Sequence, residues 1–224
     1  MTETVLLALL LVPALVIAIV FHEVSHGWTA LALGDPTAKE MRRLSFNPIR
    51  HVDPIGTIAL PGFLALVGAP VFGWAKPVPV NQWRLRNPRY GMMAVAIAGP
   101  AMNIVLATVG AIILGLVARA LGAPPPELVL TGFIYFIAIN IFLAMFNLIP
   151  LPPFDGSHIV EGLLPDAAAR AYARLRPFGF PLLIILLLVI PRLFPQFAIV
   201  ERFVLPPVEW LQDRFLMLAS VVAG

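Results

Sequence analysis

Residues 4–33 read TVLLALLLVPALVIAIVFHEVSHGWTALAL, and this stretch decides the fold class. It exceeds the roughly 20 apolar residues that a helix needs to cross a bilayer. Its start carries no basic residue and no small-residue cleavage site precedes Phe21, so we expect a retained span rather than a signal peptide. His22, Glu23 and His26 lie near its end. Ionisable groups at membrane depth are costly and usually functional, so the sequence predicts a membrane helix with a functional polar cluster.

The composition indicates a protein whose main solvent is lipid. Hydrophobic residues make up 60% of the 224 residues and charged residues 12%, whereas soluble domains carry about 25% charged residues. No hydrophilic stretch is long enough for a second domain, so we expect one membrane domain over residues 1–224. The net charge of +3 comes from basic residues in short segments between apolar runs. That pattern follows the positive-inside rule and does not indicate nucleic-acid binding.

The remaining apolar runs predict an α-helical membrane protein. Their length and their interruption by proline and glycine place helical spans at residues 4–33, 91–121, 128–150 and 178–199, with a fifth candidate at 203–222. We therefore expect about five transmembrane helices, within a range of about four to six.

One apolar stretch, residues 57–75, does not read as a simple helix. Its interruptions are Pro61, Gly62, Gly68, Pro70 and Gly73. Basic residues flank it within 35–56 and 76–90. If the stretch dips into the bilayer and returns, all eight of these positive charges share the cytoplasmic side. We predict a re-entrant, partly extended element at about 57–80, where irregular backbone must be covered by protein or line a wet cavity.

The polar cluster has the residue types of a zinc hydrolase. His22 and His26 are four residues apart, so on a helix both imidazoles lie on one face. Two imidazoles can bind the metal, and Glu23 beside them can act as a base toward a water molecule. The charge pattern places this cluster near the cytoplasmic end of the first span. The span at 128–150 runs in the same direction, so a third ligand is expected near its end.

Two residues after that span compete for the third ligand position. Asp155 follows a proline-broken helix end and precedes Gly156, and a carboxylate there would complete a site with an open position for water. His158, three residues on, would also serve, and spacing alone does not separate the two. His51 is a weaker candidate in a loop that could fold back.

Further motifs follow the H-E-V-S-H sequence in a defined order. They are NP at 47–48, HVDPIGT at 51–57, GWAKPVPVN at 73–81, AGPAMN at 98–103 and NLIPLPPFDG at 147–156. With these motifs the chain resembles the site-2 proteases, which are intramembrane zinc metalloproteases, in the short branch that lacks PDZ and CBS domains. The resemblance covers residues 17 to about 160, and the C-terminal 60 residues add no motif.

The resemblance implies a set of site residues around one catalytic Zn²⁺. Its metal ligands are His22, His26 and Asp155, its general base is Glu23, and its substrate-binding residues are Asn147 and Pro152. Gly99, Pro100 and Asn103 match the middle helix of a three-helix catalytic core, where we expect close packing. The core would span about residues 4–160, with C-terminal helices at about 178–222.

The resemblance also implies the reaction and its setting. Such an enzyme hydrolyses peptide bonds in or near transmembrane segments of membrane-protein substrates, as in regulated intramembrane proteolysis. We expect it in a prokaryotic cell (inner) membrane, with the active site toward the cytoplasm. Two other classes remain: a transporter that uses the His pair as an ion site, and a catalytically silent binding partner. The absence of an inverted repeat disfavours the first and the intact Glu23 the second. The sequence selects neither an oligomeric state nor a single substrate.

Overall fold

The computed structural model describes residues 3–66, 74–194 and 200–224. Within these ranges the regular structure is entirely helical. Four helical stretches of the described chain are long and apolar enough to cross a membrane: Val5–Ala32, Pro88–Leu121, Glu127–Asn147 and Asp166–Leu193. The predicted α-helical membrane fold is confirmed, and the four stretches fall within the expected range.

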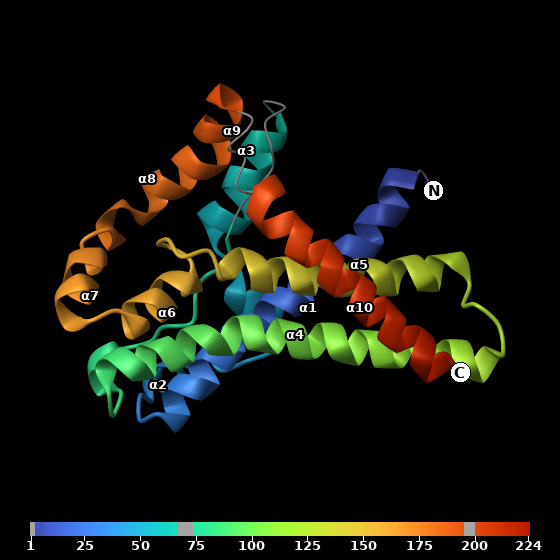
Figure 1. Cartoon of the computed structure of the whole chain (residues 1–224), viewed down its shortest axis with the longest axis horizontal. Coiled ribbons are helices and arrows are strands. Elements are labelled where there is room, and N and C mark those ends of the chain that lie inside the picture. The colour runs from blue at the N-terminus through green and yellow to red at the C-terminus, as the bar shows by residue number, and fades with distance from the viewer. Residues whose placement is uncertain (1–2, 67–73, 195–199) are drawn as a thin grey trace.

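Three long helices form the centre of the molecule: α1 (Glu3–Ala32), α4 (Pro88–Leu121) and α5 (Glu127–Asn147). The Asn87 side chain caps α4 by accepting the Tyr90 N–H. The helix ends at Gly122, whose φ of 62° is a left-handed conformation that glycine adopts without strain. Prolines fill the short link that follows, so α5 turns back and packs antiparallel to α4 (Figure 1).

Small and branched side chains fill the interior between these helices. Ala107 and Ala111 of α4 cluster with Ile137 and Ile141 of α5, and all four are fully buried. Small residues let helix backbones approach closely where lipid supplies no hydrophobic driving force between helices. α1 packs against both α4 and α5 and runs in the same direction as α5, so the C-terminal ends of α1 and α5 lie at one end of the molecule (Figure 1). This parallel arrangement is the one that the charge pattern predicts.

The C-terminal part of the chain packs on this centre mainly through its first and last helices. Its elements are α6 (Asp155–Leu163), α7 (Asp166–Ala173), η4 (Arg176–Phe178), α8 (Gly179–Ile184), η5 (Ile185–Val189), α9 (Ile190–Leu193), η7 (Val200–Val204) and α10 (Leu205–Ala223). The helical stretch expected at 178–199 begins earlier, at Asp166, and residues 195–199 lie outside the described chain. The fifth candidate forms α10, which packs across α4 and α5. It is not one of the four apolar stretches, and it carries Glu209, Asp213 and Arg214.

The segment predicted to be re-entrant leaves and returns at one place. It follows α2 (Thr37–Glu40) and η1 (Pro48–His51), and runs through η2 (Pro54–Ala59) and α3 (Leu60–Leu66). Residues 67–73 lie outside the described chain, and residues 74–81 are extended up to η3 (Gln82–Arg84). On its return the Trp74 N–H donates to the Gly56 carbonyl (3.1 Å) and the Lys76 N–H to the His51 carbonyl (2.8 Å). Entry and exit are therefore side by side, as a re-entrant element requires.

The first half of this segment is helical, which its proline and glycine content did not suggest. Asp53 starts the helix, because its Oδ1 accepts the N–H groups of Ile55 (3.0 Å) and Gly56 (2.7 Å). Pro54 occupies the first helical position, where the missing N–H costs nothing. The second half is extended without a β ladder, because Pro77 and Pro79 have no N–H to donate.

Candidate metal centre

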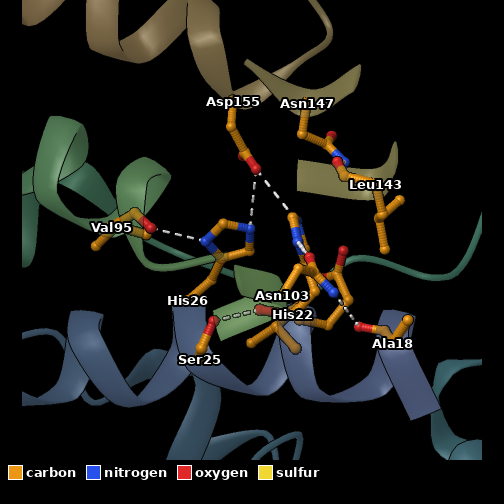
Figure 2. A network of polar contacts seen from close by, with 11 residues as sticks. Ala18, His22, Ser25, His26, Val95, Asn103, Leu143, Asn147 and Asp155 are labelled. Atoms are coloured by element: carbon orange, nitrogen blue, oxygen red, sulfur yellow. Dashed lines mark hydrogen bonds and ion pairs between the residues drawn. The ribbon is translucent and has the colours of Figure 1, made fainter. Parts of the chain in front are cut away.

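Two imidazoles and one carboxylate meet at the C-terminal end of α1. The Nε2 atoms of His22 and His26 lie 3.1 Å and 3.4 Å from the same oxygen, Oδ2 of Asp155 (Figure 2). The two rings are perpendicular, with centroids 4.6 Å apart. The ligand atoms all lie within 4.8 Å of one another, and no other group of this kind occurs in the described residues. The structure thus brings together the three residues that the resemblance nominates as ligands.

A tight turn after α5 carries Asp155 to this position. α5 ends at Asn147, and the proline-rich turn leads directly into α6, which begins at Asp155. Gly156 makes the turn possible, since a Cβ at that residue would collide with the carbonyl oxygens of Leu148 and Ile149. Only glycine lets α6 start against the end of α5 and present Asp155 to α1.

The environment of these atoms suits a bound cation. His22 and His26 are 5% and 8% exposed, and Oδ2 of Asp155 is buried without a hydrogen bond in the described chain. Burial alone would raise the pKa of Asp155, but the two facing imidazoles outweigh it and hold the pKa below its usual range. A buried carboxylate oxygen that faces two ring nitrogens is stabilised by a ring proton or by a cation held between them. Two nitrogens and one oxygen form the donor set of a catalytic zinc site with one open position.

Helix α4 anchors both rings through their other nitrogen. Nδ1 of His26 lies 2.7 Å from the Val95 carbonyl oxygen, and Nδ1 of His22 lies 2.6 Å from Oδ1 of Asn103. Gly99 sits between these two anchors, where a Cβ would come within 2.5 Å of Cε1 of both imidazoles. We expected close packing from this motif, and Gly99 fulfils that role. Asn103 does more, because it contacts a proposed ligand directly.

A sequence signal for these anchors exists. Val95, Gly99 and Asn103 are each four residues apart, so they share one face of α4. A polar residue and a glycine on one face of an apolar helix indicate a close and polar neighbour. The pattern does not reveal that the neighbour is the His22–His26 face, because that depends on how α4 is rotated against α1.

Glu23 is held by the extended segment on another side of the centre. Its Oε2 accepts the main-chain N–H of Val78 at 2.8 Å. Glu23 directly follows His22 on α1, so it adjoins the group of candidate ligands. The base expected from the sequence therefore stands between the imidazoles and residues 74–81.

Side chains from the loop that follows α1 hold that segment in place. The buried Arg43 donates from Nη2 to the carbonyl oxygens of Lys76 (2.9 Å) and Pro77 (3.3 Å). Asp35 is fully buried, and its Oδ2 accepts the Asn81 N–H at 2.6 Å. Burial would raise the pKa of Asp35, but hydrogen bonds from Thr37 and Asn81 hold that pKa below its ordinary value. Separate polar contacts, rather than a β ladder, thus keep residues 74–81 extended.

The two residues nominated for substrate binding lie beyond Asp155. The Asn147 amide nitrogen donates to the Leu143 carbonyl oxygen of its own helix at 2.9 Å, on the α5 side of the site (Figure 2). Pro152 is buried, and its Cβ lies close to Gly179: a Cβ added at Gly179 would come within 3.1 Å of the Cβ of Pro152. Pro152 thus packs against the start of α8.

The other two histidines do not join the group of ligand atoms. His158 lies 3.4 Å from Nη2 of Arg176, which pairs with Glu161, and burial together with the Arg176 charge lowers the pKa of His158. His51 is buried and contacts the Ser45 carbonyl oxygen at 2.8 Å, while its own carbonyl accepts the Lys76 N–H. Of the three rivals for the third position, only Asp155 has its ligand atom in the group with His22 and His26 in the described chain.

Comparison with known proteins agrees with this geometry. Residues 122–190 match peptidase family M50. YwhC of Bacillus subtilis, described as a candidate zinc metalloprotease, is 39% identical over 180 residues, which are 79% of this chain and 78% of YwhC. The Rip2 proteins, described in the same way, are 28% identical over 185 residues in Mycolicibacterium smegmatis (83% of this chain, 68% of the relative) and 31% over 174 residues in Mycobacterium tuberculosis H37Rv (77% and 64%). No solved structure matches the chain significantly.

Proposed function

This chain belongs to peptidase family M50, the site-2 proteases, and from that premise we propose that it cleaves peptide bonds in or near transmembrane segments of other membrane proteins. Family membership and the four apolar helices make it an integral membrane zinc metalloprotease. The observation that carries the finer proposal is the convergence of His22, His26 and Asp155 at the end of α1.

His22, His26 and Asp155 hold the zinc ion in this proposal. Their support is the buried Oδ2 of Asp155, which faces two ring nitrogens and has no hydrogen bond in the described chain. When bound, zinc polarises the scissile carbonyl group and lowers the pKa of a coordinated water molecule toward about 7.

Glu23 acts as the general base. It accepts a proton from the attacking water and passes that proton to the leaving amine. The hydrogen bond from the Val78 N–H orients one carboxylate oxygen and leaves the other for the water. Because Val78 belongs to the extended segment, the position of the base depends on the position of that segment.

The extended segment binds the substrate by adding a strand. A helical substrate hides its carbonyl groups in its own hydrogen bonds, so it must unwind before cleavage. Trp74 and Lys76 direct their main-chain groups toward residues 51–57, and Ala75 between them faces the opposite edge, since alternate residues of an extended chain point to opposite sides. An unwound substrate can pair there. Asn147 and Pro152 complete the substrate site near Asp155.

This pairing can be tested at Ala75. Replacing Ala75 with proline removes the main-chain N–H that would pair with the substrate strand. We therefore expect cleavage to fall while bound zinc is unchanged. The matched control is Ala75→Ser, which keeps the N–H. Full activity of Ala75→Pro on a transmembrane peptide would exclude strand addition at this edge.

The orientation follows from the basic loops. Residues 35–56 and 76–90 adjoin the end of α1 that carries the centre, and positively charged loops stay in the cytoplasm. We therefore place the active site toward the cytoplasm of a prokaryotic cell, in the inner membrane. Residues 1–224 form one domain, with the catalytic core at about 4–160 and the C-terminal helices at about 178–222.

A single comparison tests the proposal as a whole. Wild type and Glu23→Gln are purified, bound zinc is measured, and a transmembrane peptide is offered in vesicles. We expect zinc in both proteins and cleavage by the wild type alone. Cleavage by Glu23→Gln at the wild-type rate would refute the role of Glu23, and zinc-dependent ion flux without cleavage would favour a transporter.

A further inference from the structure

A chain of buried amides links all three central helices at His22. Asn103 of α4 and Asn140 of α5 are both 0% exposed. The Asn103 amide nitrogen donates to the Ala18 carbonyl oxygen of α1 (3.1 Å) and to Oδ1 of Asn140 (3.0 Å). The Asn140 amide nitrogen donates to the Phe136 carbonyl oxygen at 2.8 Å. Figure 2 shows Asn103 between Ala18 and His22.

The direction of the hydrogen bonds along this row of amides is determined at its two ends. The main-chain carbonyl oxygens of Ala18 and Phe136 can only accept hydrogen bonds. Asn140 must therefore turn its nitrogen toward Phe136 and its oxygen toward Asn103. Asn103 in turn donates one N–H to Ala18 and the other to Asn140. Reversing the Asn103 amide would place its oxygen opposite two other acceptors, so its oxygen is the atom that faces His22.

An acceptor at Nδ1 determines the proton position on the His22 ring. Oδ1 of Asn103, 2.6 Å away, requires an N–H at Nδ1. The neutral ring then carries its lone pair on Nε2, the nitrogen 3.1 Å from Oδ2 of Asp155. For His26 the Val95 main-chain carbonyl has the same effect. The difference is that a main-chain acceptor persists through any substitution of Val95, whereas the acceptor for His22 is a side chain.

We propose that Asn103 is a positioning residue that selects the metal-binding tautomer of His22, and that Asn140 supports it by orienting the Asn103 amide. This inference rests on the proposed ligand set. Loss of such a hydrogen-bond partner typically costs about 10–100-fold in metal affinity. Helix packing uses the Asn103 nitrogen, which bonds both neighbouring helices, and thereby leaves the oxygen as an acceptor 2.6 Å from the His22 ring.

The first test needs no substitution. The ring nitrogens of the zinc-loaded protein are observed by ¹⁵N NMR, and the four histidines are assigned by replacing each in turn. We expect His22 in the form with the proton on Nδ1. A wild-type His22 ring with its proton on Nε2 would overturn the proposal.

The second test uses zinc affinity, measured by competition with a chelator. Asn103→Leu should bind zinc about 10–100-fold more weakly and lose the Nδ1–H signal of His22. Asn140→Leu should have a smaller effect, because Asn103 keeps its bond to Ala18. Asn140→Asp in its neutral form can donate to Phe136 and accept from Asn103, so it should restore most of the affinity. Unchanged affinity and ring spectrum in both leucine variants would reduce the asparagines to packing residues.

Two controls separate this inference from the proposed function. Thr108→Val removes a hydrogen bond from α4 to the Ile104 carbonyl without touching His22, so its zinc affinity should match the wild type. His22→Ala should lose zinc. If His22→Ala binds zinc normally, the ligand set itself is wrong. If His22→Ala loses zinc while Asn103→Leu does not, only the positioning role fails.

Discussion

The two sides of the centre are built differently. On the α4 side, the imidazoles meet a buried main-chain carbonyl, a fully buried asparagine and a glycine, all on one continuous helix. On the other side, Glu23 meets residues 74–81, which belong to no helix or β ladder and are held by a few hydrogen bonds, among them those from Arg43 and to Asp35. Helix packing thus makes the metal side rigid, whereas the segment proposed to receive substrate depends on a few polar bonds that can readjust. Damage to the first side should therefore cost zinc, and damage to the second should cost turnover with zinc retained.

The largest effect is expected from Asp155→Ala. This change removes the only anionic member of the proposed ligand set and leaves two imidazoles facing a cavity. We expect stoichiometric zinc to be lost and cleavage to fall to background, as measured by metal analysis and peptide hydrolysis. Asp166→Asn is the control, because Asp166 pairs with Arg89 outside the site. Normal zinc content in Asp155→Ala would remove Asp155 from the ligand set.

The rigid side can be broken without removing a ligand. In Gly99→Ala the new Cβ would lie 2.5 Å from both imidazole rings, so the rings or α4 must move. Overpacking of this kind costs about 1–3 kcal/mol of stability, and zinc affinity should fall by about 10-fold or more. Gly132→Ala on α5 meets only the flexible end of Leu10, at 3.3 Å, and should be tolerated. Equal zinc affinity and equal thermal stability of the two variants would argue against a tight contact between α4 and the rings.

A change on the side of residues 74–81 should lower the turnover rate without changing bound zinc. Val78→Pro removes the N–H that holds Glu23, and the extended backbone there accommodates proline. We expect kcat to fall about 10-fold, a fraction of the contribution of a general base, with bound zinc unchanged. Val80→Pro makes the same change two residues away from that contact and should retain activity. Loss of zinc in Val78→Pro would show that the two sides are not independent.

The smallest effect concerns pH. Asp35 has a lowered pKa in the folded protein, so the stability that it contributes is present above its unfolded pKa, near about 4, and is lost as the pH falls through the folded value. Wild type should therefore unfold at higher temperature than Asp35→Asn at neutral pH, and the difference should shrink below about pH 4. A difference that stays constant with pH would mean that the Asp35 charge does not anchor residues 74–81.

Local sequence patterns predicted much of this arrangement. The apolar runs located α1, α4 and α5, and the charge of the loops predicted that α1 and α5 run in parallel. The four-residue spacing of His22 and His26 placed both rings on one face. The helical entry of the re-entrant segment was not foreseen, because Pro61 and Gly62 read as interruptions, whereas the helical run that begins at Pro54 continues past both residues. Proline and glycine lower the expectation of a helix without excluding one, and here the cap at Asp53 starts a helix that tolerates both.

Periodicity, composition and charge depend on neighbouring residues, and they were sufficient for the helices, the parallel course of α1 and α5, and the common face of the two imidazoles. Spacing left Asp155, His158 and His51 as rivals for one position, because it does not say which loop folds toward α1. The turn at Gly156 brings Asp155 to the imidazoles and leaves the other two histidines with other partners. The roles of Asn103 and Asn140 likewise depend on how α4 and α5 pack against α1. His22 and Asn103 are 81 residues apart, so the hydrogen bond between them forms only when α4 is rotated to face α1 with that side chain.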